Sequence, residues 1–379
     1  MRIVTAANRL AAIGGLELAQ LEACRQLRGR GHRIDLLYTE HGDLTPRWAE
    51  LTERRLRVRG YALFRGAPLA SLRSVAGVAT AVRRLAPTVV YIHHQHHSPS
   101  AVLGGRPVVC HLHLPPAPSR SLQDELALRR CRRLIAVSRF TAGQWSEILG
   151  VGIDRFSVVA NGVDPGRFRP ADDDTRASVR AGLGLPVDKF LVVFAGRVDP
   201  DKGVDRALEA MRLLDSDAYH LAVAGQANPG SFGGDAAAAR SYAEGLQRQY
   251  ADVAATWLGR LPDVASLLSA ADVMILPSRF PDPLPLIVLE TLASGTPIVA
   301  SAVGGIPEML TGPLAENLVQ SGEPAEFAAR LRALRDWRSA NPMLALFGRE
   351  HVERNFSLRE MGDRINQAIE AAAGDGRDG

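Results

Sequence analysis

A length of 379 residues, of which 46% are apolar and 23% charged, supports two cores of ordinary domain size better than one. No stretch reaches the roughly 20 apolar residues that span a bilayer, and the N-terminal residues lack the apolar segment of a secretion signal, so we expect a cytosolic protein. Cys24, Cys110 and Cys131 show no C-x-x-C spacing, which indicates reduced, mostly buried thiols rather than a disulfide framework or a zinc site.

The net charge of +4 hides an uneven distribution along the chain. Residues 1–160 hold 23 arginines against 11 acidic residues, whereas residues 161–379 hold 22 basic against 30 acidic residues. Arginine clusters at 54–59 and 129–133 could attract an anionic acceptor or an acidic membrane surface, and an ordinary solvated face explains them equally well. No aromatic residues are interleaved with these clusters, so nucleic acid is not an expected partner.

Short apolar runs rich in β-branched residues alternate with helical patterns along the chain. The runs lie at 1–7, 32–38, 88–93, 106–113, 133–138 and 156–161, then at 190–196, 219–225, 272–278 and 296–301. Runs that are apolar on both faces are typical of central parallel strands, so the pattern predicts an α/β fold with two parallel sheets. Proline, glycine and consecutive acids at 161–174 predict a linker between the domains, and the tail at 374–379 is expected to be disordered.

In open α/β sheets, ligands lie beyond the carboxyl ends of the strands, so the residues after each run deserve inspection. Gly14 and Gly15 follow the first run, at the expected start of the helix over 16–32, where backbone N–H groups can approach a phosphate. An ordinary pair of loop glycines would look the same. No early strand is followed by G-x-G-x-x-G, which disfavours a NAD-dependent dehydrogenase.

The segment FAGRVDPDKG, residues 194–203, carries Lys202, one of only two lysines in the chain, five residues after Arg197. Both cations follow a predicted strand and precede the helix expected over 205–214, so both can reach one crevice. A planar guanidinium and a compact ammonium together suit a diphosphate. The alternative is a surface ion pair of Lys202 with Asp199 or Asp201.

Asp282 and Glu290 are separated by seven residues, the first in a proline-rich loop and the second on the helix expected over 285–293. Such carboxylates can accept hydrogen bonds from sugar hydroxyls, and the N–H groups near Leu286 and Ile287 at the helix start can meet a phosphate. A helix-capping aspartate and a solvated glutamate are the alternatives.

Histidines gather after two predicted strands, at 93–97 and at 111–113. Neighbouring histidines cannot all face one ion, and no cysteine or carboxylate stands at ligand spacing, so no metal site is expected. We expect instead that His113, or else His111, meets a substrate hydroxyl or phosphate.

Five long segments together resemble the retaining glycosyltransferases of family 4, which have the GT-B fold. They are residues 14–38, 134–170, 194–203, 258–278 and 288–310, in the family's usual order. The resemblance implies two Rossmann-like parallel-sheet domains that face each other across a cleft. It implies an acceptor-binding domain at 1–168, a nucleotide-sugar-binding domain at 169–355, and a C-terminal helix within 356–379 that returns to the first domain.

By position, the resemblance assigns Arg197 and Lys202 to the donor diphosphate, which Gly15 would approach from the other domain. Glu290 matches the acid that binds the ribose hydroxyls, and Asp282 stands where the family usually has glutamate beside the donor sugar. His113 matches the histidine of the first domain, with His111 as the second choice. The sequence departs from the family's E-P-F-G pattern at three positions, with Asp282, Leu284 and Pro285, so an unusual sugar or reduced activity would follow.

The resemblance implies sugar transfer with retention, from a UDP or GDP sugar to a hydroxyl of a small natural product or a cell-envelope glycolipid or saccharide. Arg197 and Lys202 would stabilise the leaving diphosphate, so neither a metal nor a further cofactor is expected. The basic first half permits peripheral contact with the inner face of a membrane. The departures near Asp282 leave one alternative, a non-catalytic protein that binds sugar nucleotides.

Overall fold

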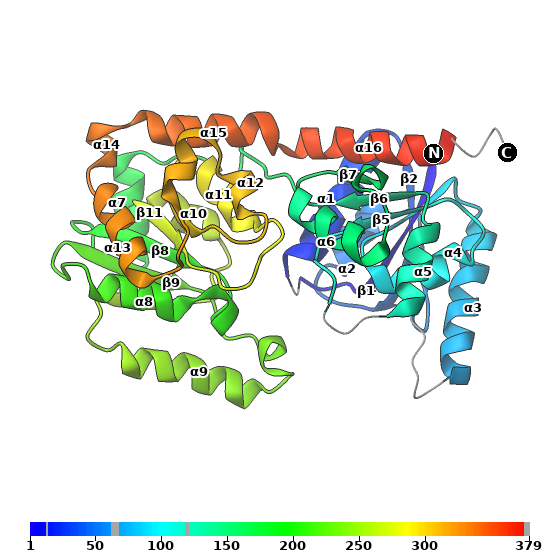
Figure 1. The fold of residues 1–379 in the computed structure, drawn as a ribbon, viewed down its shortest axis with the longest axis horizontal. Coiled ribbons are helices and arrows are strands. Elements are labelled where there is room, and N and C mark those ends of the chain that lie inside the picture. The colour runs from blue at the N-terminus through cyan, green and yellow to red at the C-terminus, as the bar shows by residue number, and fades with distance from the viewer. Residues whose placement is uncertain (13, 62–67, 118–120, 375–379) are drawn as a thin grey trace. The chain divides into compact units, whose positions relative to one another are not determined.

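The structure is a computed structural model that describes residues 1–12, 14–61, 68–117 and 121–374 (Figure 1). The tail whose disorder was expected lies, apart from Gly374, outside these residues. The chain divides into two compact units, Met1–Gly162 together with Leu358–Gly379, and Val163–Ser357. In the described part of the chain, no helix is long and apolar enough to cross a membrane.

The first unit is built on a seven-stranded parallel sheet with the order β3-β2-β1-β4-β5-β6-β7. Its strands are β1 (Arg2–Arg9), β2 (Arg33–Glu40), β3 (Arg54–Arg57), β4 (Val89–Ile92), β5 (Val108–Leu112), β6 (Arg133–Ala136) and β7 (Phe156–Val158). Its helices are α1 (Gly15–Gly29), α2 (Thr45–Leu51), α3 (Pro68–Leu85), α4 (Ser98–Val102), α5 (Leu122–Arg130), α6 (Arg139–Leu149) and α16 (Leu358–Gly374).

Both faces of this sheet are covered by helices, because its central strands are apolar on both sides. On one face, Ile3, Val89 and Val109 pack with Leu27 of α1 and Ile365 of α16. On the other face, side chains of α3 and α6 join the core. The last helix, α16, therefore belongs to the unit that begins the chain, and Figure 1 shows it beside the first sheet.

The second unit has a six-stranded parallel sheet with the order β10-β9-β8-β11-β12-β13. Its strands are β8 (Phe190–Ala195), β9 (Tyr219–Ala224), β10 (Ala255–Gly259), β11 (Val273–Leu276), β12 (Ile298–Ser301) and β13 (Leu318–Val319). Its helices are α7 (Asp173–Gly182), α8 (Val204–Arg212), α9 (Ala236–Gln249), α10 (Val264–Ala270), α11 (Leu286–Ala293), α12 (Ile306–Met309), α13 (Pro324–Ala333), α14 (Trp337–Ala340) and α15 (Met343–Asn355).

The prediction of two parallel sheets in an α/β fold is confirmed, and so is the burial of the three free cysteines. The sequence pattern did not predict β3, β10 or β13. Each of these strands lies at an edge of its sheet. An edge strand has only one neighbour, so it needs no continuous apolar run: β3 is exposed at all four positions and β13 has only two residues.

Asp272, just before β11, links the amino-terminal ends of β8 and β11 to the helix α7, at the edge of the second sheet opposite the expected ligand site. Its carboxylate accepts from Arg176 at 2.6 Å, from Arg180 at 2.8 Å and from the Leu191 N–H at 2.7 Å. Burial raises the pKa of Asp272, but the charge of Arg180 and the Leu191 N–H outweigh this effect and hold it below its usual value. The ion pair fixes α7 against the starts of β8 and β11.

Replacing Asp272 with Asn should lower the free energy of unfolding by about 3 to 5 kcal/mol, because it leaves the buried Arg180 without its countercharge. The exposed Asp336 offers a matched control, and Asp336→Asn should change stability by no more than about 0.5 kcal/mol. Urea denaturation of both variants measures the difference, and equal small effects would show that the Asp272 network contributes little to stability.

Candidate functional site

In the second unit, the order of connections reverses between β8 and β11. The chain passes from β8 to β9 on one side, whereas β11 lies on the other side of β8. At such a switch point the loops after the two strands separate, and a crevice forms at the carboxyl ends. Residues 196–203 follow β8 and residues 277–285 follow β11, so the expected donor residues Arg197, Lys202 and Asp282 all belong to this point.

The two loops contact each other through their backbones. The N–H groups of Arg279 and Phe280 both donate to the Asp201 carbonyl, at 2.8 Å and 3.1 Å. Gly203 adopts a left-handed conformation with φ of 72°, and a Cβ there would overlap the Pro277 carbonyl oxygen. A side chain at Gly203 would therefore push the loops apart.

Asp199 organises the loop after β8. Its buried carboxylate accepts the N–H of Lys202 at 3.0 Å and the hydroxyl of Ser231 at 2.7 Å. The Arg197 guanidinium lies 3.3 Å from the same carboxylate and donates to the Ser231 hydroxyl at 3.0 Å. One buried carboxylate thus positions both predicted phosphate-binding cations, while the Arg197 side chain stays 43% exposed and accessible to a ligand.

Lys202 reaches across the switch point and forms an ion pair with Asp282. The expected alternative, a pair with Asp199 or Asp201, is not what the structure shows, because Asp199 accepts the backbone N–H of Lys202 instead. The side chains of Lys202 and Asp282 are 14% and 17% exposed, which shields the pair from water without closing it off. A cation and a carboxylate are therefore held together by the loops after β8 and β11, and the first of these loops also carries the exposed Arg197.

Two residues that the sequence analysis did not single out strengthen this side of the unit. Arg279 forms a bidentate pair with Asp205, at 2.7 Å and 2.5 Å, and also donates to the Pro200 carbonyl at 3.0 Å. Arg279 stands three residues after the end of β11, at the edge of the sheet where ligands are expected. Its position after a strand was therefore a signal present in the sequence. Its role is to fasten the loop after β11 onto the start of α8.

The helix α11 begins at Leu286, one residue after the expected start, with Pro285 in the N-cap position. Asp282 therefore does not cap this helix, and the first-turn N–H groups of Leu286 and Ile287 have no partner within the helix. Glu290 lies further along α11 and is half-buried rather than freely solvated. Burial raises the pKa of Glu290 to about 7, and the charge of Arg167 lowers it only in part.

In the first unit, the corresponding reversal lies between β1 and β4. Gly15 is the first residue of α1, which begins after β1, and Gly14 is its N-cap. The Glu17 carboxylate accepts the Gly14 N–H at 2.9 Å, so this helix start already holds a negative charge. After β4, the His97 Nε2 lies 3.2 Å from the amide oxygen of Asn8 near the end of β1, which links the segments on either side of the reversal.

His93, His111 and His113 lie together on one face of the first sheet. The register pairs Ile92 with Cys110, so the next residues along β4 and β5 are neighbours, and His113 follows two residues later on the same face. The His93 Nδ1 lies 2.9 Å from the His113 Nε2, and the His111 Nδ1 lies 2.8 Å from the Tyr91 hydroxyl. Burial lowers the pKa of all three, that of His111 to about 3, so the rings are neutral at neutral pH.

The ligand nitrogens of these three histidines lie within 4.8 Å of one another, closer than the sequence suggested. The rings of His93 and His113 are stacked with an interplanar angle of 23°, and the ring of His111 is tilted from them by 34° and 30°. The Nδ1 of His93 and the Nε2 of His113 lie at hydrogen-bond distance, so these two nitrogens are paired with each other. The arrangement is a hydrogen-bonded stack, and His113 is nine-tenths buried within it.

The second unit therefore brings together Arg197, Lys202 and Asp282, with Leu286, Ile287 and Glu290 on the helix that follows. The first unit holds Gly15 and the histidine stack, at the carboxyl ends of β1, β4 and β5. Two Rossmann-like parallel-sheet units in one chain are typical of the GT-B glycosyltransferases.

Comparison with known proteins identifies the family within this class. Residues 189–336 match the model described as glycosyl transferases group 1, and residues 13–167 match the model described as glycosyltransferase family 4. A D-inositol 3-phosphate glycosyltransferase 1 of Catenulispora acidiphila is 30% identical over 96% of this chain and 92% of that relative. The chain belongs to family 4 of the glycosyltransferases.

Other matches are shorter or more distant. A D-inositol 3-phosphate glycosyltransferase of Thermomonospora curvata is 35% identical over 57% of this chain, and the match spans about half, 52%, of that relative. The crystal structure of Anabaena HepE with UDP and glucose superposes with a TM-score of 0.80 at 19% identity, over 98% of this chain and all of HepE. This likeness shows the same fold and confirms the GT-B prediction.

The raised pKa of Glu290 predicts a pH dependence of stability. Its folded-state pKa of about 7 exceeds the ordinary value of 4.5, so the folded state favours the protonated acid. The contribution of Glu290 to the free energy of unfolding is fully present below pH 4.5 and is lost as the pH rises towards about 7. Glu290→Gln lacks this titration, so its unfolding free energy relative to that of the wild type should rise across this range. Denaturation curves at several pH values measure this, and a constant difference would contradict it.

Proposed function

We propose that the chain transfers a sugar from a nucleoside diphosphate sugar to a hydroxyl group, with retention of the anomeric configuration. The observation that carries the proposal is the placement of Arg197 and Lys202, which one buried carboxylate holds at the switch point of the second unit. Two cations in that place suit a diphosphate, and they lie within the residues matched to the glycosyltransferase model.

The donor class is supported by a neighbour of the same fold. Anabaena HepE was crystallised with UDP-glucose and also with UDP and glucose. We therefore propose a UDP sugar as the first donor to test, with a GDP sugar as the second. Glu290 would accept hydrogen bonds from the ribose hydroxyls, and the N–H groups of Leu286 and Ile287 would meet a phosphate.

The proposed chemistry needs no protein nucleophile. The bond between the anomeric carbon and the diphosphate oxygen breaks, and the acceptor oxygen bonds to the same face of that carbon. The departing phosphate oxygen takes the acceptor proton, while Arg197 and Lys202 stabilise the charge that develops on the diphosphate. Arriving phosphate oxygens would draw Lys202 away from Asp282, whose freed carboxylate could then accept a sugar hydroxyl.

We also keep Gly15 and His113 in the proposal, as contacts of the diphosphate and of a substrate hydroxyl. The N–H groups at the start of α1 would serve the first role, after the Glu17 carboxylate has moved away from Gly14. A neutral imidazole would serve the second, because it can donate or accept one hydrogen bond.

The acceptor is proposed from the relatives and from charge. Relatives in Catenulispora and Thermomonospora are named as D-inositol 3-phosphate glycosyltransferases, and the first 160 residues carry an excess of arginine. We propose a hydroxyl acceptor that carries a phosphate, either a small polyol phosphate or a cell-envelope glycolipid. Incubation with UDP and GDP sugars, with and without D-inositol 3-phosphate, and NMR of the product anomer would test the donor, acceptor and retention together.

The two lysines provide a matched pair of variants. Lys202→Ala should lower kcat by about 10²- to 10³-fold, because it removes a donor that stabilises the leaving group. Lys189→Ala removes the other lysine, which donates to the Ser216 carbonyl, and should leave kcat within about twofold of the wild type. Near-normal turnover of the Lys202 variant would remove it from the catalytic residues.

Metal independence is a separate prediction. Because two side-chain cations stand at the proposed diphosphate site, EDTA should leave the initial rate unchanged. The measurement is nucleotide release after treatment with EDTA and gel filtration. Loss of activity that Mg²⁺ or Zn²⁺ restores would show that the cations do not suffice.

Two observations favour a second candidate function. Lys202 is already neutralised by Asp282, and Pro285 has no N–H to offer a donor sugar, so the site can hold a sugar nucleotide without catalysing its transfer. Calorimetry with UDP sugars separates the two functions. Tight binding without nucleotide release, for all acceptors tried, would identify a non-catalytic binding protein.

A further inference from the structure

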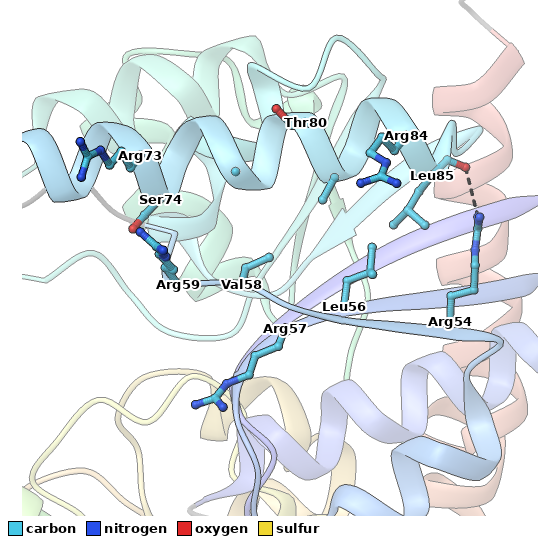
Figure 2. Close-up of a pocket in the computed structure, with 12 residues that line it drawn as sticks. Arg54, Leu56, Arg57, Val58, Arg59, Arg73, Ser74, Thr80, Arg84 and Leu85 are labelled. Carbon is cyan, nitrogen blue, oxygen red and sulfur yellow. Dashed lines mark hydrogen bonds between the residues drawn. The ribbon is translucent and has the colours of Figure 1, made fainter.

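A cavity of about 560 Å³ lies between the edge strand β3, with the residues that follow it, and the helix α3. We call it the arginine pocket, defined by Arg54, Leu56, Val58, Arg59, Arg73 and Arg84. Figure 2 shows Leu56 and Val58 pointing from the strand side towards α3, with Arg59 and Arg73 near one end and Arg54 and Arg84 near the other. The walls combine an apolar surface with a cationic rim.

Most of the rim is not neutralised by the described residues. Within the described part of the chain, five arginines and no acidic residue line the cavity. Arg54 is paired with Asp35 at 2.8 Å, but Arg59, Arg73 and Arg84 form no ion pair with any described residue. Several unpaired guanidinium groups around one cavity attract an anion, and a phosphate suits their planar, forked geometry.

Gly77 leaves part of the cavity wall open. It lies within α3, where glycine is less stable than alanine, yet a Cβ at this position would meet no atom within 4 Å. Close packing therefore does not require glycine here. Together with Leu56, which is 38% exposed, and the half-buried Val58, it forms an apolar floor that a phosphate alone would not use.

Protection of the sheet edge explains only part of this arrangement. Arginines on an exposed edge strand prevent pairing with another strand, which accounts for those of β3. Arg73 and Arg84 belong to α3 rather than to the edge strand. Protection of the edge strand therefore does not explain why they line an open cavity.

We propose that the arginine pocket binds an anionic phospholipid, with the phosphate held by Arg59 and Arg73 and an acyl chain lying along Leu56, Val58 and Gly77. The charge of the rim selects the anionic headgroup, and the apolar floor selects hydrocarbon over a free phosphate. The proposal rests on residues of the first unit alone and does not depend on the proposed transfer reaction.

Co-sedimentation of the full chain with vesicles tests the proposal, without any sugar nucleotide present. The chain should bind phosphatidylcholine vesicles that contain roughly a third phosphatidylglycerol at least about tenfold more tightly than pure phosphatidylcholine. Arg59→Glu with Arg73→Glu should weaken this binding by at least about tenfold. The control pair, Arg47→Glu with Arg130→Glu, makes the same charge change at exposed positions outside the pocket and should weaken it by less than about threefold.

Two variants of one residue separate the pocket from diffuse charge. Gly77→Leu fills the floor without a charge change and should weaken vesicle binding by about fivefold or more, whereas Gly77→Ala should bind nearly as the wild type does. Circular dichroism and thermal unfolding verify that each variant is folded. Short-chain phosphatidylglycerol should compete with vesicles at concentrations where inorganic phosphate does not.

Four results would overturn the proposal. They are no preference for phosphatidylglycerol, equal losses from the two arginine pairs, undiminished binding by a folded Gly77→Leu variant, and equal competition by inorganic phosphate. The second and third would show diffuse attraction to the surface, and the last would show a site for soluble anions.

Discussion

The candidate site depends on one buried carboxylate, that of Asp199. It accepts a backbone N–H and a hydroxyl and stands beside a guanidinium, so its charge is compensated where no water reaches it. Because Asp199 fixes the turn of residues 200–202, the direction of Lys202 follows from the backbone rather than from a flexible side chain alone. Arg197 is held by the same carboxylate, so both cations have a common reference point.

Two glycines allow the loops near Lys202 and Asp282 to approach one another closely. Gly203 allows the loop after β8 to lie against the Pro277 carbonyl, and Gly304 allows the loop after β12 to lie against the Asp282 carbonyl. Both have positive φ, at 72° and 61°. The chain can therefore bring three loops together at the switch point only where no Cβ intervenes. The ion pair of Lys202 and Asp282 is the result of this close approach.

The sequence predicts much of this arrangement. The strands and side-chain contacts that it does not predict were missed for physical reasons. Central strands such as β8 and β11 are apolar throughout, so both parallel sheets could be predicted, whereas the exposed β3 carries no such signal. The cations after β8 could be placed at the ligand edge because topology alone puts them there. The side chains that pair with these cations could not be predicted, because the pairing of Lys202 with Asp282 spans 80 residues and depends on loop conformations. The stack of His93 on His113 likewise depends on strand register, which the run of histidines does not reveal.

The pairing of Lys202 with Asp282 has a consequence for how ligands leave the proposed site. A free phosphate that displaced Asp282 from Lys202 would leave a shielded carboxylate without a partner, so it would gain less than from a bare lysine. Under the proposed function, a sugar nucleotide would avoid that loss, because its sugar hydroxyls would give Asp282 new donors. After the proposed transfer these donors would be gone, and Asp282 would compete again with the diphosphate for Lys202. The same ion pair would then favour intact donor over inorganic phosphate and hasten the release of the spent nucleotide.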